Sequence, residues 1–384
     1  MFFFPAYSRR MEQIRHTAPS AADADLLPER PRKGRGAVGN QSGRYERETR
    51  HLIDDGWGTA NPLAGDPPPL KTTVSVDASR TVLARNTSPD IPFDRSINAY
   101  RGCEHGCVYC YARPTHAWMG LSPGLDFETK LFAKPNAPAL LRTALAGSGY
   151  QCAPIAMGTN TDPYQPIERD YRITRGLLKV LDECSHPLTI VTKSALVLRD
   201  LDILSAMAKR NLVKVSLSVT TLDRGLSRRM EPRAATPVRR LETIEALARA
   251  GVPTGVMAAP MIPALNDHEM ESILEAAAQA GASEAGYILL RLPLEIKTLF
   301  REWLEAHKPD KAKHVFSLVR QTRGGELYKA KFGERMKGEG PYAALLKGRF
   351  DAAIRRLGLN EQSFDLDTAS FAPPAKDARQ MSLL

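Results

Sequence analysis

Three of the chain's five cysteines lie within eight residues, at Cys103, Cys107 and Cys110. They are spaced C-x3-C-x2-C. Thiolates bind zinc and iron–sulfur clusters, and four thiolates would saturate a 4Fe–4S cluster. Three leave one iron with an open coordination position. The spacing therefore indicates a metal centre at which a reaction can occur.

Zinc is the alternative metal for this cysteine group, and His105 or His116 would then be the fourth ligand. Structural zinc sites usually combine two C-x-x-C pairs, or one such pair with a distant histidine pair. The sequence has neither arrangement, so it favours the iron–sulfur cluster.

Length and composition are typical of a soluble globular protein. The chain has 384 residues, of which 43% are hydrophobic and 25% charged. No apolar run approaches the ~20 residues that span a bilayer, and the hydrophobic start is too short for a signal-peptide core. We therefore expect no membrane partner and a cytoplasmic location, where thiols stay reduced. The net charge of +10 fits DNA or RNA as a partner, and equally an ordinary basic enzyme.

The middle of the chain alternates between helical stretches and short, apolar, β-prone stretches. Such alternation predicts right-handed βαβ units around a parallel sheet. We expect an α/β fold, a partial (β/α)6 TIM-like barrel. Its six strands are predicted at Ser96–Tyr100, Pro154–Gly158, Leu188–Thr192, Val213–Val219, Thr254–Ala258 and Ala285–Leu290.

Four regions are predicted along the chain. They are a flexible basic N-terminal extension (1–70), a lead-in hairpin (71–94), the barrel core (95–296), and a helical, basic C-terminal region with a frayed tail (297–384). The piece from Gly34 to Gly39 could contact phosphates, but no aromatic residues interleave with its glycines. We therefore expect a solvated tail there. The two hairpin strands are predicted at Thr72–Val76 and Thr81–Ala84.

Active sites of such barrels lie at the C-terminal ends of the strands. The cysteine loop follows the first predicted strand, and the end of the second strand is dense in functional side chains. We predict that Tyr164, Gln165 and Glu168 face the substrate pocket and are candidates for catalysis. The alternative, that Pro163 and Pro166 merely shape this loop, stays open.

The cysteine spacing, on a loop after the first strand of a (β/α)6 pattern and with Tyr109 before the last cysteine, resembles the radical S-adenosylmethionine (SAM) superfamily. The stretch from Gly102 to Tyr111 resembles the spore photoproduct lyase branch and its bacterial relatives, over roughly residues 89–330. Residues 34–46 resemble a radical SAM subgroup whose reaction is unassigned.

The resemblance implies that Cys103, Cys107 and Cys110 hold a 4Fe–4S cluster whose fourth iron binds SAM. One electron, from a donor of the flavodoxin or ferredoxin type, would split SAM to a 5′-deoxyadenosyl radical. That radical would abstract hydrogen from a substrate, for which nucleic acid is a candidate. The alternative is a nucleic-acid-binding protein with a structural cluster or zinc and no SAM chemistry.

The resemblance also implies contacts with SAM. Tyr109 would pack beside the adenine, and Thr161 and Lys193 would hold the methionine end. Ser216 or Ser218 would contact the ribose or the amino acid part. These two serines alternate onto one strand face, so the sequence does not choose between them.

Two features of the sequence, the segment Ala258–Pro263 and Lys193, also have simpler interpretations. Ala258–Pro263 corresponds to the strand end that lines the adenine, although a strand end broken by proline explains it as well. Lys193 could instead pair with a carboxylate such as Asp162.

The chain departs from the lyase pattern at the hydrogen-donor position. The lyases have a cysteine where this chain has Thr159. Cys152 is predicted at the start of its strand, at the wrong end of the barrel, and Cys184 is predicted to be a buried structural thiol. The sequence therefore argues for lyase-like radical chemistry but against the lyase reaction itself.

Overall fold

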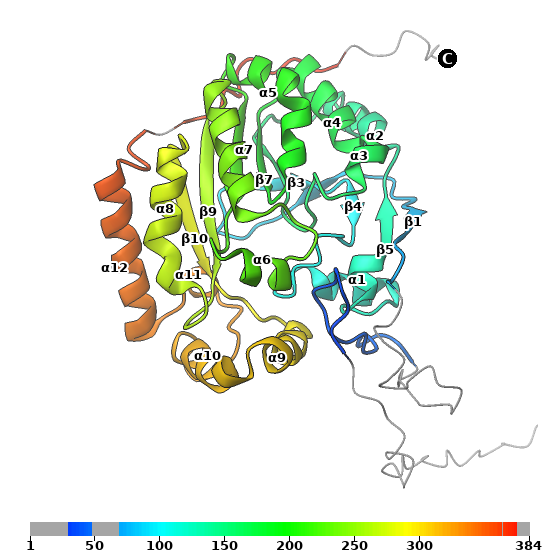
Figure 1. Cartoon of the computed structure of the whole chain (residues 1–384). Coiled ribbons are helices and arrows are strands. Elements are labelled where there is room, and N and C mark those ends of the chain that lie inside the picture. Colours follow the sequence, from blue (N-terminus) through cyan, green and yellow to red (C-terminus); the bar gives the residue numbers. More distant parts are fainter. Residues whose placement is uncertain (1–29, 48–68, 363, 375–384) are drawn as a thin grey trace, which may run out of the picture.

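The computed structural model describes residues 30–47, 69–362 and 364–374 (Figure 1). The parts of the predicted extension at 1–29 and 48–68, and the tail from residue 375, lie outside the described residues.

A seven-stranded sheet, in the order β10-β9-β8-β7-β6-β3-β2, forms the centre of the molecule. Its strands are β2 (Leu83–Arg85), β3 (Arg95–Ile97), β6 (Ile155–Met157), β7 (Leu188–Thr192), β8 (Val213–Ser218), β9 (Thr254–Met261) and β10 (Glu284–Leu289). All neighbouring pairs are parallel except β2 with β3, which is antiparallel. The six parallel strands confirm the predicted α/β partial barrel. β2 and β10 are its edges, so the sheet of the described residues does not close.

Helices follow the strands, and most of them lie outside the curved sheet, whereas the short helix α6 lies at the lower ends of the strands (Figure 1). They are α2 (Ala137–Leu145), α3 (Glu168–Tyr171), α4 (Ile173–Glu183), α5 (Leu201–Ala208), α6 (Arg224–Met230), α7 (Pro237–Arg249) and α8 (Met270–Gln279). Sequence features set their starts. At α7, the Thr236 side chain accepts a hydrogen bond from Arg239 N, and Pro237 occupies the first turn.

Among the described residues, three 3₁₀ helices complete the connections. They are η2 (Arg113–Met119), η3 (Ala195–Asp200) and η4 (Asp267–Glu269). η2 directly follows the cysteine loop. At the start of η3, the Ser194 side chain accepts from Leu196 N, which redirects the chain just after Lys193.

A second, three-stranded sheet has the order β1-β5-β4, with β1 (Thr73–Val76), β4 (Tyr100–Arg101) and β5 (Lys130–Ala133). The predicted lead-in hairpin is therefore wrong. β1 pairs with β5, whereas β2 pairs with β3 in the central sheet. Alternating residues predict a strand but not its partner. Asp77 accepts hydrogen bonds from Ser79 N and Oγ, forming a turn that leads the chain to the other sheet.

The first core strand is also shorter than predicted. β3 ends at Ile97, and Tyr100–Arg101 belong to β4 in the second sheet. The chain thus leaves the central sheet before the cysteines. The loop that carries them follows β4 of the second sheet.

The C-terminal region is helical, as predicted, with α9 (Ile296–His307), α10 (Pro309–Gln321), α11 (Glu334–Lys337) and α12 (Gly340–Leu357). α12 lies beside α8 (Figure 1), and Arg349 Nε donates to Glu271 Oε1 at 2.7 Å between them. Within the described residues, no helix is both long and apolar enough to cross a bilayer.

Candidate active site

The cysteine loop begins where β4 ends, and two glycines shape it. Gly102 and Gly106 have φ angles of +74° and +68°, in the left-handed region that favours glycine. A Cβ on Gly102 would lie 2.6 Å from Leu131 Cδ2, and one on Gly106 would lie 2.7 Å from Glu128 Oε2. The loop is thus packed too closely for a side chain at either position.

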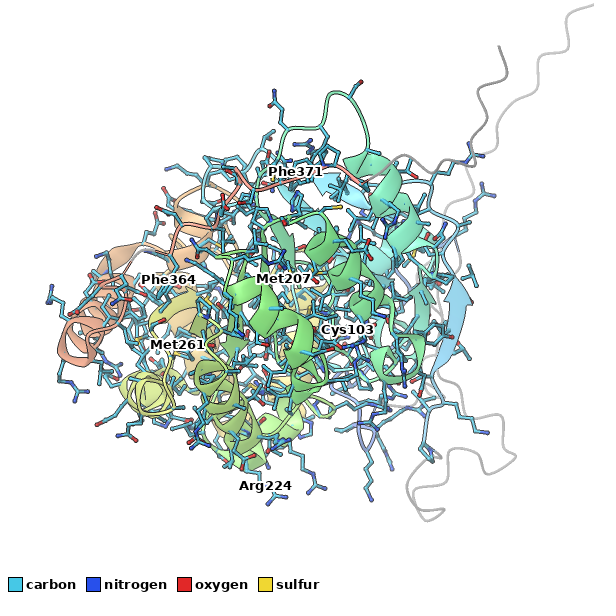
Figure 2. All side chains as sticks on the ribbon, turned by 90° about the horizontal axis from the view of Figure 1, so that it is seen from above. Cys103, Met207, Arg224, Met261, Phe364 and Phe371 are labelled. Carbon is cyan, nitrogen blue, oxygen red and sulfur yellow. The ribbon has the colours of Figure 1, made fainter. Side chains whose placement is uncertain are left out.

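The three thiols lie inside the molecule. Cys103 and Cys107 are 7% and 8% exposed, and Cys110 is half-buried. Viewed from above in Figure 2, Cys103 lies among interior side chains rather than at the molecular edge. All three are free cysteines, as metal ligands must be.

The thiols lie near one another, because Cys110 packs against the buried cluster that contains Cys103 and against the one that contains Cys107. Burial, followed by the charges of Asp162 and Cys107, raises the pKa of Cys103 well above its ordinary value. Burial and the Glu231 carboxylate raise the pKa of Cys107, while Lys193 acts in the opposite direction. Three neighbouring thiols on one loop, two of them buried and one half-buried, form a donor set that fits a 4Fe–4S cluster. A metal would supply the positive charge that favours their thiolates.

A buried ion pair holds the outer side of the loop. Arg113 Nε donates to Cys107 O at 2.8 Å, and its Nη2 donates to Gly106 O at 3.0 Å. The same Nη2 pairs with Glu128 Oε1 at 2.5 Å, and neither side chain is exposed. Arg113 and Glu128 were not among the predicted site residues. An arginine three residues after the last cysteine is a signal, but nothing in the sequence links it to Glu128.

Residues 30–47, which we call the strap, dock on this ion pair. Gly36 N and Ala37 N donate to the Glu128 carboxylate at 3.0 and 2.8 Å. Arg35 is buried, and its Nη1 donates to Glu128 O at 3.0 Å. The prediction of a solvated tail is therefore wrong for the strap. Gly36 permits a close approach of the strap backbone to the loop. Arg35 donates to the backbone carbonyls of Glu128 and Leu70.

Gln165 holds the inner side of the loop. Its Oε1 accepts from Glu104 N at 3.0 Å, and its Nε2 donates to Gly102 O at 3.1 Å. These two residues flank Cys103. Gln165 is fully buried and positions the loop, and that it also faces the substrate pocket stays a prediction.

Glu168 and Tyr164 are also fully buried. Glu168 accepts from Tyr100 OH, from Thr174 N at 3.0 Å and from Arg199 Nη2 at 2.7 Å. Burial, then the charges of Asp200 and Glu168, raise the pKa of Tyr164 well above its ordinary value. That Tyr164 and Glu168 face the substrate pocket likewise stays a prediction. Glu168 anchors the turn that Pro163 and Pro166 begin.

The structure brings Tyr109 and Lys193 together. Lys193 Nζ lies 5.8 Å from the centre of the Tyr109 ring. The Tyr109 hydroxyl is hydrogen-bonded to the Glu231 carboxylate and lies 3.2 Å from Thr220 Oγ1. Asp162 accepts from the backbone N–H of Lys193 at 2.8 Å. Within the described residues no ion pair joins the Lys193 ammonium to that carboxylate.

Thr161 is hydrogen-bonded to the segment that precedes the cysteine loop and not to Tyr109 or Lys193. Its hydroxyl donates to Tyr100 O at 3.1 Å, and its backbone N–H donates to Asn98 Oδ1 at 3.3 Å. Ser216 and Ser218 lie on β8, opposite Gly255 and Met257 of β9. Ser218 is buried, whereas Ser216 is partly exposed.

A second buried ion pair joins Glu231 to Arg240. Neither residue was predicted from the sequence to belong to the site. Arg240 Nη1 also donates to Ser218 O at 2.8 Å. Burial raises the pKa of Glu231, and Arg240 partly offsets this. Through Glu231, the pair connects Tyr109 to the end of β8. No local pattern marks these residues, because their contacts are set by the packing of α6 and α7.

The two histidines proposed for zinc have other partners. His105 Nδ1 lies 3.3 Å from Asp162 Oδ2, and His116 Nε2 lies 2.9 Å from Lys130 O. Across residues 30–47, 69–362 and 364–374, no three His, Cys, Asp or Glu side chains gather around a single-ion position. The geometry thus offers no preformed zinc site with either histidine.

The remaining cysteines lie where the sequence placed them. Cys152 precedes β6, and so lies at the N-terminal end of a strand whose C-terminal end leads to Thr161. Cys184 is buried at the end of α4. Thr159 lies at the site end of β6, where its carbonyl accepts from Tyr111 OH.

The fold and site thus define an α/β partial-barrel protein with a three-cysteine loop that follows β4, shortly after its first core strand β3. The family model of the radical SAM superfamily matches residues 97–277. The chain belongs to this superfamily and is a radical SAM enzyme.

Curated relatives match the chain in sequence. Uncharacterized proteins of Mycobacterium tuberculosis and Mycobacterium bovis are 36% identical over 233 residues, covering 60% of this chain and 68% of theirs. An uncharacterized protein of Methanocaldococcus jannaschii is 32% identical over 174 residues, covering 45% of this chain and 62% of its own.

Among solved structures, the chain resembles spore photoproduct lyase. A lyase variant with bound AdoMet and dinucleoside spore photoproduct matches with a TM-score of 0.53 and 17% identity. The match covers 74% of this chain and 80% of the lyase chain. At this identity the likeness concerns the fold.

Proposed function

We propose that Cys103, Cys107 and Cys110 hold a 4Fe–4S cluster that binds SAM at its fourth iron. When bound, these groups supply the 5′-deoxyadenosyl radical that abstracts hydrogen from the substrate. The observation that carries the proposal is the set of three neighbouring free thiols on one loop. That loop is fixed from both sides by Gln165 and by the Arg113–Glu128 pair.

The chain's own residues would bind and orient SAM. Lys193 and Tyr109 lie together at the ends of β7 and the cysteine loop, which suits a carboxylate and an adenine respectively. Thr161 with Ser216 or Ser218 would provide hydroxyls from neighbouring strand ends. Buried Glu231 and Arg240 position Tyr109 and the end of β8.

The substrate is proposed to lie within nucleic acid, on the basis of the net charge of +10 and of the lyase fold. Thr159 in place of the lyases' cysteine argues for a different final hydrogen transfer, because a hydroxyl is a poor hydrogen-atom donor. Reduced thiols support a cytoplasmic location. A one-electron donor of the flavodoxin or ferredoxin type would complete the system.

The test is anaerobic incubation of the reconstituted protein with SAM and dithionite. We expect 5′-deoxyadenosine and methionine in equal amounts. Cys107→Ala should abolish both products and lower the iron content, whereas Cys184→Ala should leave both unchanged. One zinc per chain without iron or sulfide after anaerobic purification would refute the cluster.

The nucleic-acid part is tested separately. If DNA or RNA is the substrate, the logarithm of the affinity for an oligonucleotide should fall steeply with the logarithm of the salt concentration. Binding that is absent at low salt would remove nucleic acid from the proposal without affecting SAM cleavage.

A further inference from the structure

Two chain segments flank the cysteine loop at Gly106, midway between the first two cysteines. From one side the strap approaches so closely that a Cβ on Gly36 would lie 1.7 Å from Gly106 O. From the other, Val108 N donates to Met230 O of α6 at 3.0 Å, and Arg233 N donates to His105 O at 3.3 Å. The strap and residues 224–233, which we call the α6 segment, therefore border the same part of the loop.

Both segments expose cations. Arg30 and Lys33 of the strap are exposed, and so are three arginines of the α6 segment, Arg224, Arg228 and Arg229. Within the described residues none of these five forms a salt bridge. Figure 2 shows Arg224 at the molecular edge, and in Figure 1 the dark-blue strap and α6 lie on the same side of the molecule. We call these five side chains the cationic surface.

The acidic residues next to the loop do not neutralise this surface, because they are buried and engaged. Glu128 pairs with Arg113, Glu231 pairs with Arg240, and Glu104 accepts from Thr72 Oγ1 at 2.5 Å. The cationic surface therefore presents positive charge to solvent immediately outside the cysteine loop. Such a surface attracts an acidic partner and raises its association rate.

We propose that the cationic surface is the docking site of an acidic one-electron carrier protein that reduces the cluster. The proposal rests on the function proposed above and names the place where its electron enters. In the step, one electron leaves the reduced carrier, which is oxidised by one electron, and enters the cluster, which is reduced by one. No proton or covalent bond is exchanged.

Proximity favours a carrier over nucleic acid at this place. Electron transfer slows steeply with distance, so the carrier must bind where little protein covers the cluster. At Gly106 the strap is the segment that lies against the loop, and it carries two of the exposed cations itself. Gln165 contacts the loop at other positions, Gly102 and Glu104.

The experiment uses the reconstituted full chain and flavodoxin as the probe carrier. We expect Lys33→Glu combined with Arg228→Glu to weaken binding of oxidised flavodoxin about tenfold at low salt, because each reversal replaces attraction by repulsion. SAM cleavage driven by reduced flavodoxin should slow similarly, and the difference should shrink in high salt. Cleavage driven by dithionite should be unchanged.

The matched control is Lys179→Glu combined with Lys209→Glu, two exposed lysines on and beside the helices α4 and α5. It should behave like the wild type in every assay. If the charge reversals impair folding, seen as lost iron, Lys33→Gln with Arg228→Gln should still weaken flavodoxin binding about threefold.

Unchanged flavodoxin binding in the Lys33 and Arg228 variants would overturn the docking proposal. So would a loss of oligonucleotide affinity with flavodoxin binding intact, which would assign the surface to nucleic acid. Absence of 5′-deoxyadenosine with dithionite would instead refute the proposed function, and the binding measurement would still decide the docking site.

Discussion

Individual side chains hold the cysteine loop through its backbone. Gln165 satisfies one donor and one acceptor of the loop, and Arg113 satisfies two carbonyls. Such buried backbone groups are costly when they are left unpaired. The residues that fix the loop therefore help to place the thiols that would bind the cluster. This positioning role does not require them to touch SAM or substrate.

Replacing Gln165 tests this positioning role. Gln165→Leu keeps the volume but leaves Glu104 N and Gly102 O without partners, which should cost about 1–3 kcal/mol of unfolding free energy. Iron content after reconstitution should fall as the loop loosens. Urea unfolding and iron analysis measure these effects. Gln279→Leu, on exposed α8 surface, is the control, and an unchanged Gln165→Leu protein would refute the role.

Buried histidines predict a pH dependence of stability. Burial lowers the pKa of His186 to about 4, against an ordinary value of 6.5. Between these values the unfolded chain binds a proton that the folded chain does not, so acidification favours unfolding. The contribution is complete above pH 6.5 and is lost progressively as the pH falls toward 4.

His186→Gln should reduce this dependence. Wild-type unfolding free energy should drop by about 2 kcal/mol from His186 alone between pH 7 and pH 5. The variant should lose correspondingly less over the same interval. Urea unfolding of the cluster-free protein at the two pH values measures the difference. Equal losses in both proteins would show that His186 titrates normally in the folded state.

At the scale of elements, the strap is the largest departure from the expected fold. A stretch rich in Gly and Arg is typical of a solvated tail, yet Gly36, Ala37 and Val38 are buried against the cysteine loop. The docking depends on Glu128, more than ninety positions along the chain. A local pattern does not contain that partner.

Gly36→Ala should displace the strap. The added Cβ would meet Gly106 O at 1.7 Å, and the obstacle is backbone. We expect faster hydrogen exchange in residues 34–38 and in the cysteine loop, together with lower thermal stability. Gly348→Ala is the matched control, since nothing lies within 4 Å of its Cβ and alanine favours its helix. Unchanged exchange in the strap would contradict this packing.

At the scale of the whole molecule, the segment between α10 and α12 joins the two edges of the open sheet. Arg323 Nη2 donates to Leu290 O, just after β10, at 2.9 Å. Arg335 Nε donates to Asp90 Oδ2, in the connection between β2 and β3, at 2.7 Å. Residues 323–339 thus link the strands that a closed barrel would pair directly.

Removing this link should loosen the segment. Asp90→Asn keeps the shape but removes the charge that pairs with Arg335, a loss on the order of 1 kcal/mol. Hydrogen exchange in residues 323–339 should accelerate, with little change in the central strands. Asp351→Asn, which removes the exposed pair with Lys347 on α12, should leave this segment unaffected. Protection that is equal in both variants would refute the link.

The sequence by itself determined the six parallel strands, their helices and the cysteine loop. Each depends on local information, namely apolar runs, alternation and the spacing of three thiols. It also determined the proximity of Tyr109 and Lys193, because parallel strands bring their C-terminal ends to one edge.

Only the tertiary structure decided what surrounds the loop. The strap on Glu128, the clamp by Gln165 and the pair of Glu231 with Arg240 join residues from separate elements. The chain's periodicity specifies which side chains are buried, but not which buried polar groups meet. That choice is made when all buried donors and acceptors must be satisfied at once.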